Sequence, residues 1–523
     1  MYGAFSRLFV GAFLGTLAVG IYACSSSDET KGTASNNNDV TATDAAGGST
    51  GLPVIPPAAA GNAAVLEHHG NATRDGLYTD ATLTSSAASL TRDAAFVGTV
   101  NGKVYAQPLY VENGPGAQEA FIVATEANHV TALNGAGAPI WDKSFGAPAS
   151  SNLPCGNIVP LGITGTPVID AASRTIFFDA MTTPDGNRTF KHLIYAISLD
   201  DGSTKAGWPI DFDNVMPGSS AAHHNQRGAL GLVNGTLYVP YGGHFGDCDP
   251  YKGTVIGIPI ANPTAAKAWS VAGQEGGIWA AGGVASDGTN VFATTGNTTG
   301  ASGWAGGEAI IRLKGGANFS NQPVDYFAPT NWKSLDDGDV DLGGANPVLV
   351  DMPDAPFPHL VVAFGKDSTV YLANRDNLGG IGAQLSSLKA TTGTILGASA
   401  AYKTSQGTYV AFRSQFGHGA NCPTGGAGNI SVARILPENP PRLQMAWCTD
   451  EKSLGSPMAT TADGTKAVLW DANDKLWAYD GDTGAKILAG ADLGGTMQYF
   501  NTPIVAKGRI AVALPSKLVV LKP

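Results

Sequence analysis

The chain of 523 residues carries a formal net charge of −11, and only 14% of its residues are charged. An acidic protein repels phosphate backbones, so the composition argues against a nucleic-acid partner. Its 69 glycines, and many short apolar runs that end at Gly, Asn, Asp or Pro, favour strands and turns over long helices.

The N-terminal residues have the pattern of an export signal. A basic start ending at Arg7 precedes an apolar stretch, residues 8–23, that is short for a membrane-spanning helix. Cys24 and three serines follow, which resembles a bacterial lipoprotein signal. The resemblance implies removal of residues 1–23, lipidation of Cys24, and sorting to the outer membrane with the body facing the periplasm or the cell exterior. An ordinary signal peptide with a chance cysteine is the alternative.

The segment after the cysteine is polar. Residues 24–60 hold almost no large apolar side chains, so they cannot bury enough surface to order themselves. We expect a disordered tether here, and a folded body over residues 61–523.

Two marks recur along the body. The first is a proline that opens an apolar strand, as at Pro108, Pro167, Pro347, Pro457 and Pro503. The second is a hairpin turn closed by Gly and followed by Trp, as before Trp141 and Trp208. Together they define eight units, which begin near residues 103, 161, 227, 277, 341, 393, 455 and 497.

This spacing fits a four-stranded blade, so the sequence predicts an all-β, eight-bladed propeller. The last unit offers only three strands, and a strand over residues 94–100 is expected to complete it and close the ring. Seven blades are the alternative, because the unit over residues 393–448 is irregular. We expect a monomer.

Four cysteines remain in the body: Cys155, Cys248, Cys422 and Cys448. An even number in an exported chain predicts two disulfides, for which three pairings exist. We favour Cys155–Cys248 and Cys422–Cys448, because the second pair encloses a segment with the pattern of a strand hairpin.

The turn-and-tryptophan element resembles the repeat of propellers named for pyrroloquinoline quinone (PQQ). Residues 69–76, 102–111, 123–126 and 162–170 are similar to a group of secreted or lipoprotein members of these propellers. From about residue 65 to the end, the resemblance implies the fold. For activity it leaves two classes open: a PQQ- and calcium-dependent oxidoreductase acting on an alcohol or sugar, and a non-enzymatic propeller such as the outer-membrane assembly lipoprotein.

The resemblance implies no catalytic residue here. The chain has no adjacent cysteine pair, and no local pattern matches the calcium ligands of the quinoprotein alcohol dehydrogenases. We therefore favour a binding or scaffold module for an envelope protein, glycan or small ligand, with the quinoprotein dehydrogenase as the alternative.

Candidate site residues come from the segments that precede each first strand, because the innermost strands of a propeller line its axis. They predict a central funnel that binds a small molecule or ion, formed by Gln107, Thr166, Gln226, Arg227, Trp279, Asp341, Asn346, Ser456 and Asn501. An internal hydrogen-bond network among the same residues is the alternative. The weaker candidates for a metal site are Asp337, Asp339, Asp341 and His224.

Overall fold

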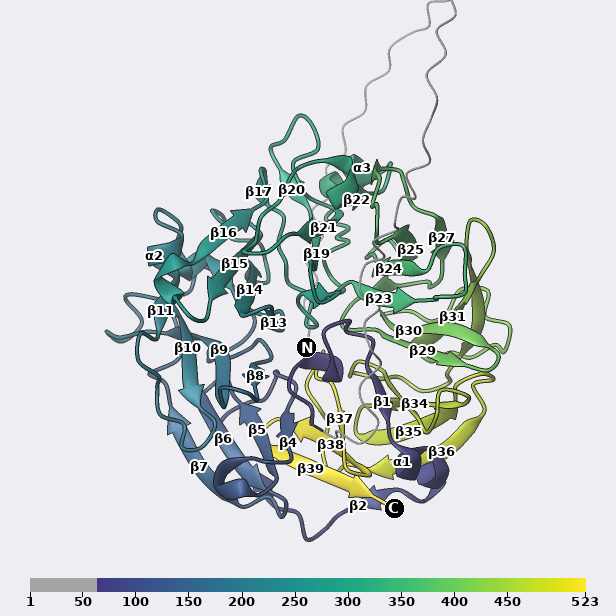
Figure 1. Ribbon diagram of the computed structural model, residues 1–523, viewed down its shortest axis with the longest axis horizontal. Coiled ribbons are helices and arrows are strands. Elements are labelled where there is room, and N and C mark those ends of the chain that lie inside the picture. The colour runs from purple at the N-terminus through teal and green to yellow at the C-terminus, as the bar shows by residue number, and fades with distance from the viewer. Residues whose placement is uncertain (1–63) are drawn as a thin grey trace, which may run out of the picture. The chain divides into compact units, whose positions relative to one another are not determined.

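Antiparallel four-stranded sheets are repeated eight times around a central axis in the computed structural model, which describes residues 64–523 (Figure 1). The predicted eight-bladed, all-β propeller is confirmed, and the seven-bladed alternative is wrong. The predicted signal, Cys24 and the tether lie outside the described residues. Among residues 64–523, no helix is long and apolar enough to cross a membrane.

Each blade begins at the axis and adds its strands outward. Blade 1 contains β4 (Leu109–Val111), β5 (Ala120–Ala124), β6 (His129–Asn134) and β7 (Pro139–Ser144). Blade 2 contains β8 (Val168–Asp170), β9 (Thr175–Thr182), β10 (Lys191–Ser198) and β11 (Ile210–Asp211). Blade 3 contains β13 (Gly231–Val233), β14 (Thr236–Gly243), β15 (Thr254–Pro259) and β16 (Lys267–Ser270). Blade 4 contains β18 (Ala285–Ser286), β19 (Val291–Thr295), β21 (Ala309–Leu313) and β22 (Tyr326–Ala328).

The second half of the ring repeats this order. Blade 5 contains β23 (Val348–Asp351), β24 (His359–Phe364), β25 (Thr369–Asn374) and β27 (Ser386–Lys389). Blade 6 contains β29 (Ala400–Thr404), β30 (Gly407–Gln415), β31 (Ile430–Leu436) and β32 (Arg442–Cys448). Blade 7 contains β33 (Met458–Thr461), β34 (Ala467–Ala472), β35 (Lys475–Asp480) and β36 (Lys486–Asp492). Blade 8 contains β37 (Ile504–Ala506), β38 (Arg509–Leu514) and β39 (Lys517–Lys522).

Short elements fill the connections. The α-helices of the described part are α1 (Ala81–Ser86), α2 (Phe212–Val215) and α3 (Trp332–Gly338). Extra strand pairs are formed by β1 (Leu77–Thr79) on β33, β12 (His224–Asn225) on β14, β17 (Gln274–Glu275) with β20 (Thr298–Thr299), β26 (Gly380–Ile381) on β22, and β28 (Thr394–Ile395) on β30.

An N-terminal strand closes the ring, as expected, but it is interrupted. β2 (Thr91–Arg92) and β3 (Gly98–Thr99) both pair with β39 of blade 8. Between them the chain turns at Asp93, whose carboxylate accepts from the backbone N–H of Ala95 at 3.1 Å. The strand predicted over residues 94–100 is therefore replaced by two short strands, the first of which precedes residue 94. The turn between them leaves the Phe96 side chain buried in the core.

The core lies between the blades. β5, β9 and β19 are buried along both faces because each is covered by two neighbouring sheets, whereas the outer strand β7 is largely exposed. Tryptophans join neighbours at the periphery: the Trp447 indole in blade 6 donates to the Gly481 carbonyl of blade 7 at 3.0 Å. Gly484 has a φ of +72°, and a Cβ there would lie 2.6 Å from the Trp447 ring.

The centre of the ring is filled by residues 65–76 (purple in Figure 1). Backbone carbonyls of this plug accept hydrogen bonds from the first strands of five blades, namely those of Leu66, Ala72, Thr73, Asp75 and Gly76. Arg74, with 1% of its surface exposed, donates to the Leu230 and Val284 carbonyls of blades 3 and 4, both at 2.8 Å. The axis is therefore not an open channel.

Candidate functional site

The chain direction assigns each loop to one of two faces. Loops that follow the second and fourth strand of a blade emerge at what we call the upper face, and those that follow the first and third strand emerge at the lower face. The segments that connect successive blades all belong to the upper face. Function in propellers resides in such loops, because the sheets themselves are closed and packed.

Six of the nine predicted funnel residues bond to the ring rather than to open space. Gln107 accepts from the His69 N–H at 2.9 Å, and the Thr166 hydroxyl accepts from the Gln107 N–H at 2.9 Å. Asn501 donates to the Tyr105 and Ala106 carbonyls at 3.2 and 3.0 Å.

The other three of these six bond either close to their own strand or, for Ser456, to the neighbouring blade. They are Gln226, which donates to Gly228 and Pro240 carbonyls, Asn346, which donates to the Pro347 carbonyl, and Ser456, which accepts from the Ala398 N–H. All six are buried. They bond within the ring, but one side-chain oxygen each of Gln226, Asn346 and Asn501 is buried without a hydrogen-bond partner among residues 64–523, so both alternatives from the sequence stay open.

The remaining three predicted residues do meet, and a lysine that the sequence did not single out joins them. The Trp279 indole N–H donates to one carboxylate oxygen of Asp341 at 3.2 Å. The Lys366 ammonium lies 2.6 Å from the same oxygen. Lys366 also pairs with Asp339 at 2.7 Å and lies 5.4 Å from the Trp279 ring centroid. Arg227 lies 5.9 Å from that centroid.

Carboxyl groups crowd this side of the upper face, in blades 3 to 5. Burial, followed by the neighbouring Asp249 and Asp247 carboxylates, raises the pKa of Glu275 to about 7. Burial and then Asp341 raise the pKa of Glu308 well above its usual range. Although burial lowers the pKa of Lys366, the charges of its aspartate partners raise it overall, so Lys366 is the cation that balances this cluster.

The weak metal candidates do not converge as a ligand set. Asp337 pairs with Lys333, and Asp339 and Asp341 pair with Lys366. His224 faces the Ser220 carbonyl at 2.8 Å through its Nδ1. Within residues 64–523 no group of three or more His, Cys, Asp and Glu side chains is arranged to hold a metal ion.

A calcium ion of the quinoprotein type does not fit these residues. One oxygen of Asp341 accepts from the Asn297 N–H at 2.9 Å, and the other is taken by Trp279 and Lys366. An ammonium therefore occupies the place beside the carboxylate that a divalent cation would need. An open groove of about 500 Å³, lined among others by Lys143, lies between blades 1 and 2 and not on the axis. We derive no quinone chemistry.

Both disulfides lie at the upper face. The structure pairs Cys155 with Cys248 and Cys422 with Cys448, as favoured from the sequence. The first joins the connection between blades 1 and 2 to the loop after β14. The second fastens the loop over residues 416–429 to the end of β32.

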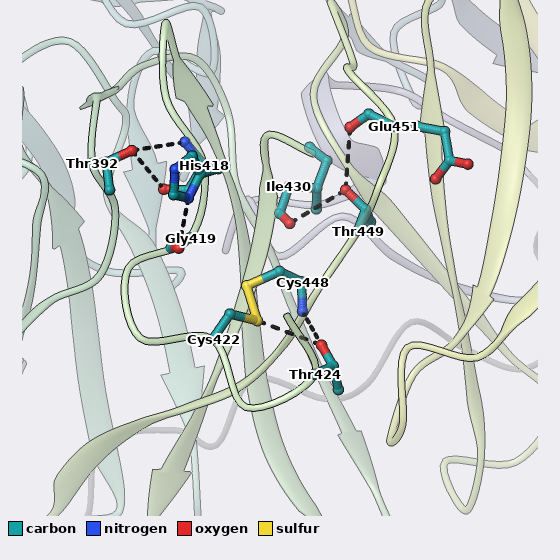
Figure 2. The surroundings of a disulfide bond; sticks show 9 residues. All are labelled: Thr392, His418, Gly419, Cys422, Thr424, Ile430, Cys448, Thr449 and Glu451. Carbon is teal, nitrogen blue, oxygen red and sulfur yellow. Dashed lines mark hydrogen bonds between the residues drawn. A yellow bond between two sulfur atoms is a disulfide. The ribbon is translucent and has the colours of Figure 1, made fainter. Parts of the chain in front are cut away.

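Figure 2 shows how the second loop is held. The Cys448 N–H donates to the Thr424 hydroxyl at 3.2 Å, next to the disulfide. On its other side, the His418 N–H donates to the Thr392 hydroxyl at 3.1 Å, and this hydroxyl donates to the His418 carbonyl at 3.3 Å. The loop is therefore fixed to its own blade and to the connection from blade 5.

These braced loops carry exposed apolar side chains. Six large apolar side chains are exposed among residues 64–523, and four of them belong to upper-face loops: Val159, Phe245, Phe416 and Tyr499. Phe416 has 91% of its surface exposed and a φ of +58°, a conformation that bulky residues rarely adopt. The sequence analysis missed these residues, because exposure of a single aromatic residue depends on the tertiary structure.

No protein-family model and no curated protein matches the chain. Solved structures do match. A quinohemoprotein alcohol dehydrogenase from Comamonas testosteroni superposes with a TM-score of 0.60 at 14% identity, over 88% of this chain and 80% of that chain. A europium-containing methanol dehydrogenase gives 0.61 at 13% identity, over 88% and 98%.

BamB from Moraxella catarrhalis gives a TM-score of 0.50 at 14% identity, over 83% of this chain and 98% of that chain. At these identities the likeness shows the fold alone. The chain thus shares the propeller fold of PQQ-type dehydrogenases and of BamB, and the choice between an enzyme and a binding module depends on its own residues.

Proposed function

We propose that this protein is a lipid-anchored propeller of the bacterial cell envelope that acts as a binding or scaffold module through its upper face. Of the ligand classes left open by the sequence, which are a protein, a glycan and a small molecule, we favour a protein. The single observation that supports this proposal is the set of exposed apolar side chains on disulfide-braced loops.

The physical reason is the cost of ordering a binding surface. Exposed aromatic side chains contribute most to protein interfaces when they are held rigid before binding. Phe416 and Phe245 belong to loops that are each fastened by a disulfide, so they lose little conformational freedom on docking. The two side chains belong to different blades, 3 and 6, but to the same face of the ring.

Site-specific photo-cross-linking in the native cell tests the proposal. A photoreactive phenylalanine replaces Phe416 or Phe245 in the full chain, and Ile381 serves as the matched control. Ile381 is 45% exposed but lies at the circumference beside β22. We expect a discrete cross-linked product at the two upper-face positions and none at Ile381. No product at either position, or the same products at all three, would overturn the proposal.

The anchor is tested separately. Cys24→Ser should release the protein from the membrane fraction, and mass spectrometry of the wild-type N-terminus should find an acylated Cys24. A soluble wild-type protein would contradict the outer-membrane assignment while leaving the upper-face proposal intact.

The alternative function is a PQQ-dependent oxidoreductase, favoured by the fold of the two dehydrogenases and by Trp279 at the upper end of the axis. Addition of PQQ and calcium to the purified protein, with a dye acceptor and a panel of alcohols and sugars, separates the two. We expect no dye reduction, because Lys366 occupies the cation position beside Asp341. Substrate-dependent reduction would refute the binding-module proposal.

A further inference from the structure

One buried arginine of this propeller lacks an acidic partner. Four arginines are buried among residues 64–523, and three of them pair with a carboxylate: Arg74 with Glu67 at 2.7 Å, Arg312 with Asp325 at 2.6 Å and Arg375 with Asp351 at 2.6 Å. The fourth, Arg413 in β30, is 2% exposed and makes no ion pair and no side-chain hydrogen bond within this part of the chain.

Aromatic rings surround this guanidinium instead. Arg413 Cζ lies 5.9 Å from the Tyr499 ring centroid and 5.3 Å from that of Phe500. Burial lowers the pKa of Arg413 to about 10, which still leaves it charged at neutral pH. A buried charge without a counter-charge is costly, so its retention requires a compensating anion.

No carboxylate of the surrounding loops pairs with this guanidinium. Three upper-face loops of this sector, residues 390–399, 416–429 and 493–502, contain no Asp, Glu, Lys or Arg. The connection from blade 6 to blade 7, residues 449–457, carries Asp450, Glu451 and Lys452, but Glu451 pairs with Lys486 and accepts from Tyr479, and neither carboxylate pairs with Arg413. The acidic cluster described above belongs to blades 3 to 5. Arg413 thus has no carboxylate partner among residues 64–523, and a counter-charge would come from outside this part of the chain.

A second arginine in the same protein shows what completes such a site. Arg509 also lies over two rings, 5.8 Å from that of Tyr110 and 5.4 Å from that of Phe121. There the chain itself provides the carboxylate, because Glu119 contacts the Arg509 guanidinium at 2.7 Å. Both arginines lie over two rings, but Arg509 is 17% exposed and has a carboxylate partner, whereas Arg413 is buried and has none.

The backbone beside Arg413 is strained. Phe416 and Phe500 have φ angles of +58° and +65°, in the left-handed region that phenylalanine rarely occupies. Gly397 permits the Phe500 position, because a Cβ there would lie 3.2 Å from the ring. A strained backbone conformation persists where many surrounding contacts hold it in place, and such conformations are concentrated at binding sites.

We propose that Arg413, flanked by Tyr499 and Phe500, is the centre of a binding site for an aromatic carboxylate, either as a free acid or as the C-terminal residue of a peptide. A guanidinium pairs with a carboxylate through two parallel hydrogen bonds, and the rings offer an apolar bed for the body of the ligand. Because a single guanidinium offers one positive charge, the site favours a monoanion over phosphates and other polyanions.

Calorimetric titration of the full chain tests this site. The probes are 3-phenylpropionate and N-acetylphenylalanine as free acids, a short peptide that ends in phenylalanine with a free C-terminus, and the amidated forms of the last two as matched controls. We expect the carboxylates to bind and the amides not to bind. If the peptide binds and the two small acids do not, the ligand is a polypeptide C-terminus; the reverse order favours a free acid.

Two variants separate binding from folding. Arg413→Met should weaken carboxylate binding by at least about tenfold, which is 1.4 kcal/mol, and should melt at or above the wild-type temperature because it removes an unpaired buried charge. Arg509→Met removes a paired charge, so it should melt lower and bind the probes unchanged.

The proposal is overturned if none of the carboxylates binds the wild-type chain in the millimolar range, or if Arg413→Met binds them as tightly as the wild type. It deepens the proposed function by naming the chemistry of one upper-face ligand. The two fail separately, because the titration needs no cellular partner and the cross-linking at Phe245 and Phe416 needs no carboxylate.

Discussion

The plug at the centre of the ring provides the sharpest stability prediction. Arg74 reaches from the plug to two blades and also donates to plug groups: the Glu67 carboxylate at 2.7 Å, the His68 carbonyl at 3.0 Å and the Asn71 carbonyl at 3.1 Å. Arg74→Met keeps the length of the side chain and removes every donor. The acceptors then remain buried without partners, and the Glu67 carboxylate loses its counter-charge.

The magnitude follows from these acceptors. A hydrogen bond to a charged group contributes about 1.5–3 kcal/mol, but bonds that share one guanidinium are not additive. Breaking a buried ion pair by removing one partner costs about 3–5 kcal/mol, and we expect Arg74→Met to lower the free energy of unfolding by this amount. Arg74→Lys should lose less, because an ammonium retains part of the bonding.

Equilibrium unfolding in guanidinium chloride, followed by tryptophan fluorescence, measures this change. Arg442→Met is the matched control, since Arg442 pairs with Glu438 at the exposed surface and its loss should not shift the midpoint. If Arg74→Met unfolds at the same midpoint as Arg442→Met, the plug does not hold the ring and our account of the closed axis is wrong.

Three further predictions concern buried ionisable groups and the braced loops. Although burial lowers the pKa of His192, its partner Asp179, 2.6 Å away, raises it overall, above the usual histidine value of about 6.5. The stabilisation is therefore complete below that value and is lost as pH rises through the folded pKa. His192→Gln should abolish this slope in urea unfolding, and an unchanged slope would contradict the pairing. Burial raises the pKa of Asp471 to about 8, and neither of its oxygens has a hydrogen-bond partner among residues 64–523. The free energy of unfolding should therefore fall as pH rises above about 3.8, and Asp471→Asn should raise it by about 2–4 kcal/mol at pH 7. A lower free energy of unfolding in Asp471→Asn at that pH would refute the reasoning. Replacing Cys422 and Cys448 together by alanine opens a loop with a sequence separation of 26. The loss of chain-entropy stabilisation should lower the free energy of unfolding by about 3.5 kcal/mol, measured by calorimetric melting. An unchanged melting temperature would show that the disulfide does not stabilise this loop.

The fold was predictable because its signals are local and repeated. A proline at the start of each first strand, and a turn closed by glycine before a tryptophan, recur in unit after unit, so an error in one unit leaves the count of eight intact. The closing strand was harder, because the turn at Asp93 depends on a single side chain that caps the backbone. No repeat signals such an interruption.

The funnel was only partly predictable. The sequence placed polar residues just before the inner strands, and in the structure Gln107 and Asn346 precede β4 and β23. It could not show that the edges of these strands and the plug would use most of their hydrogen-bonding capacity, as Asn501 and Gln107 demonstrate. Lys366 and Arg413 were missed because each follows or ends an ordinary strand, and only the arrangement of neighbouring blades shows what surrounds their charges.

The upper face is divided into two sectors by charge. Blades 3 to 5 hold the acidic cluster that Lys366 balances, whereas three loops that flank Arg413, residues 390–399, 416–429 and 493–502, carry no acidic residue. The cation of the first sector, Lys366, is paired with carboxylates, whereas Arg413 has no ion-pair partner among residues 64–523. A ligand that neutralises Arg413 and covers Phe416 would satisfy both features of the Arg413 sector at once, and this is why we assign binding to that side of the face and a mainly structural role to the Trp279–Asp341–Lys366 cluster.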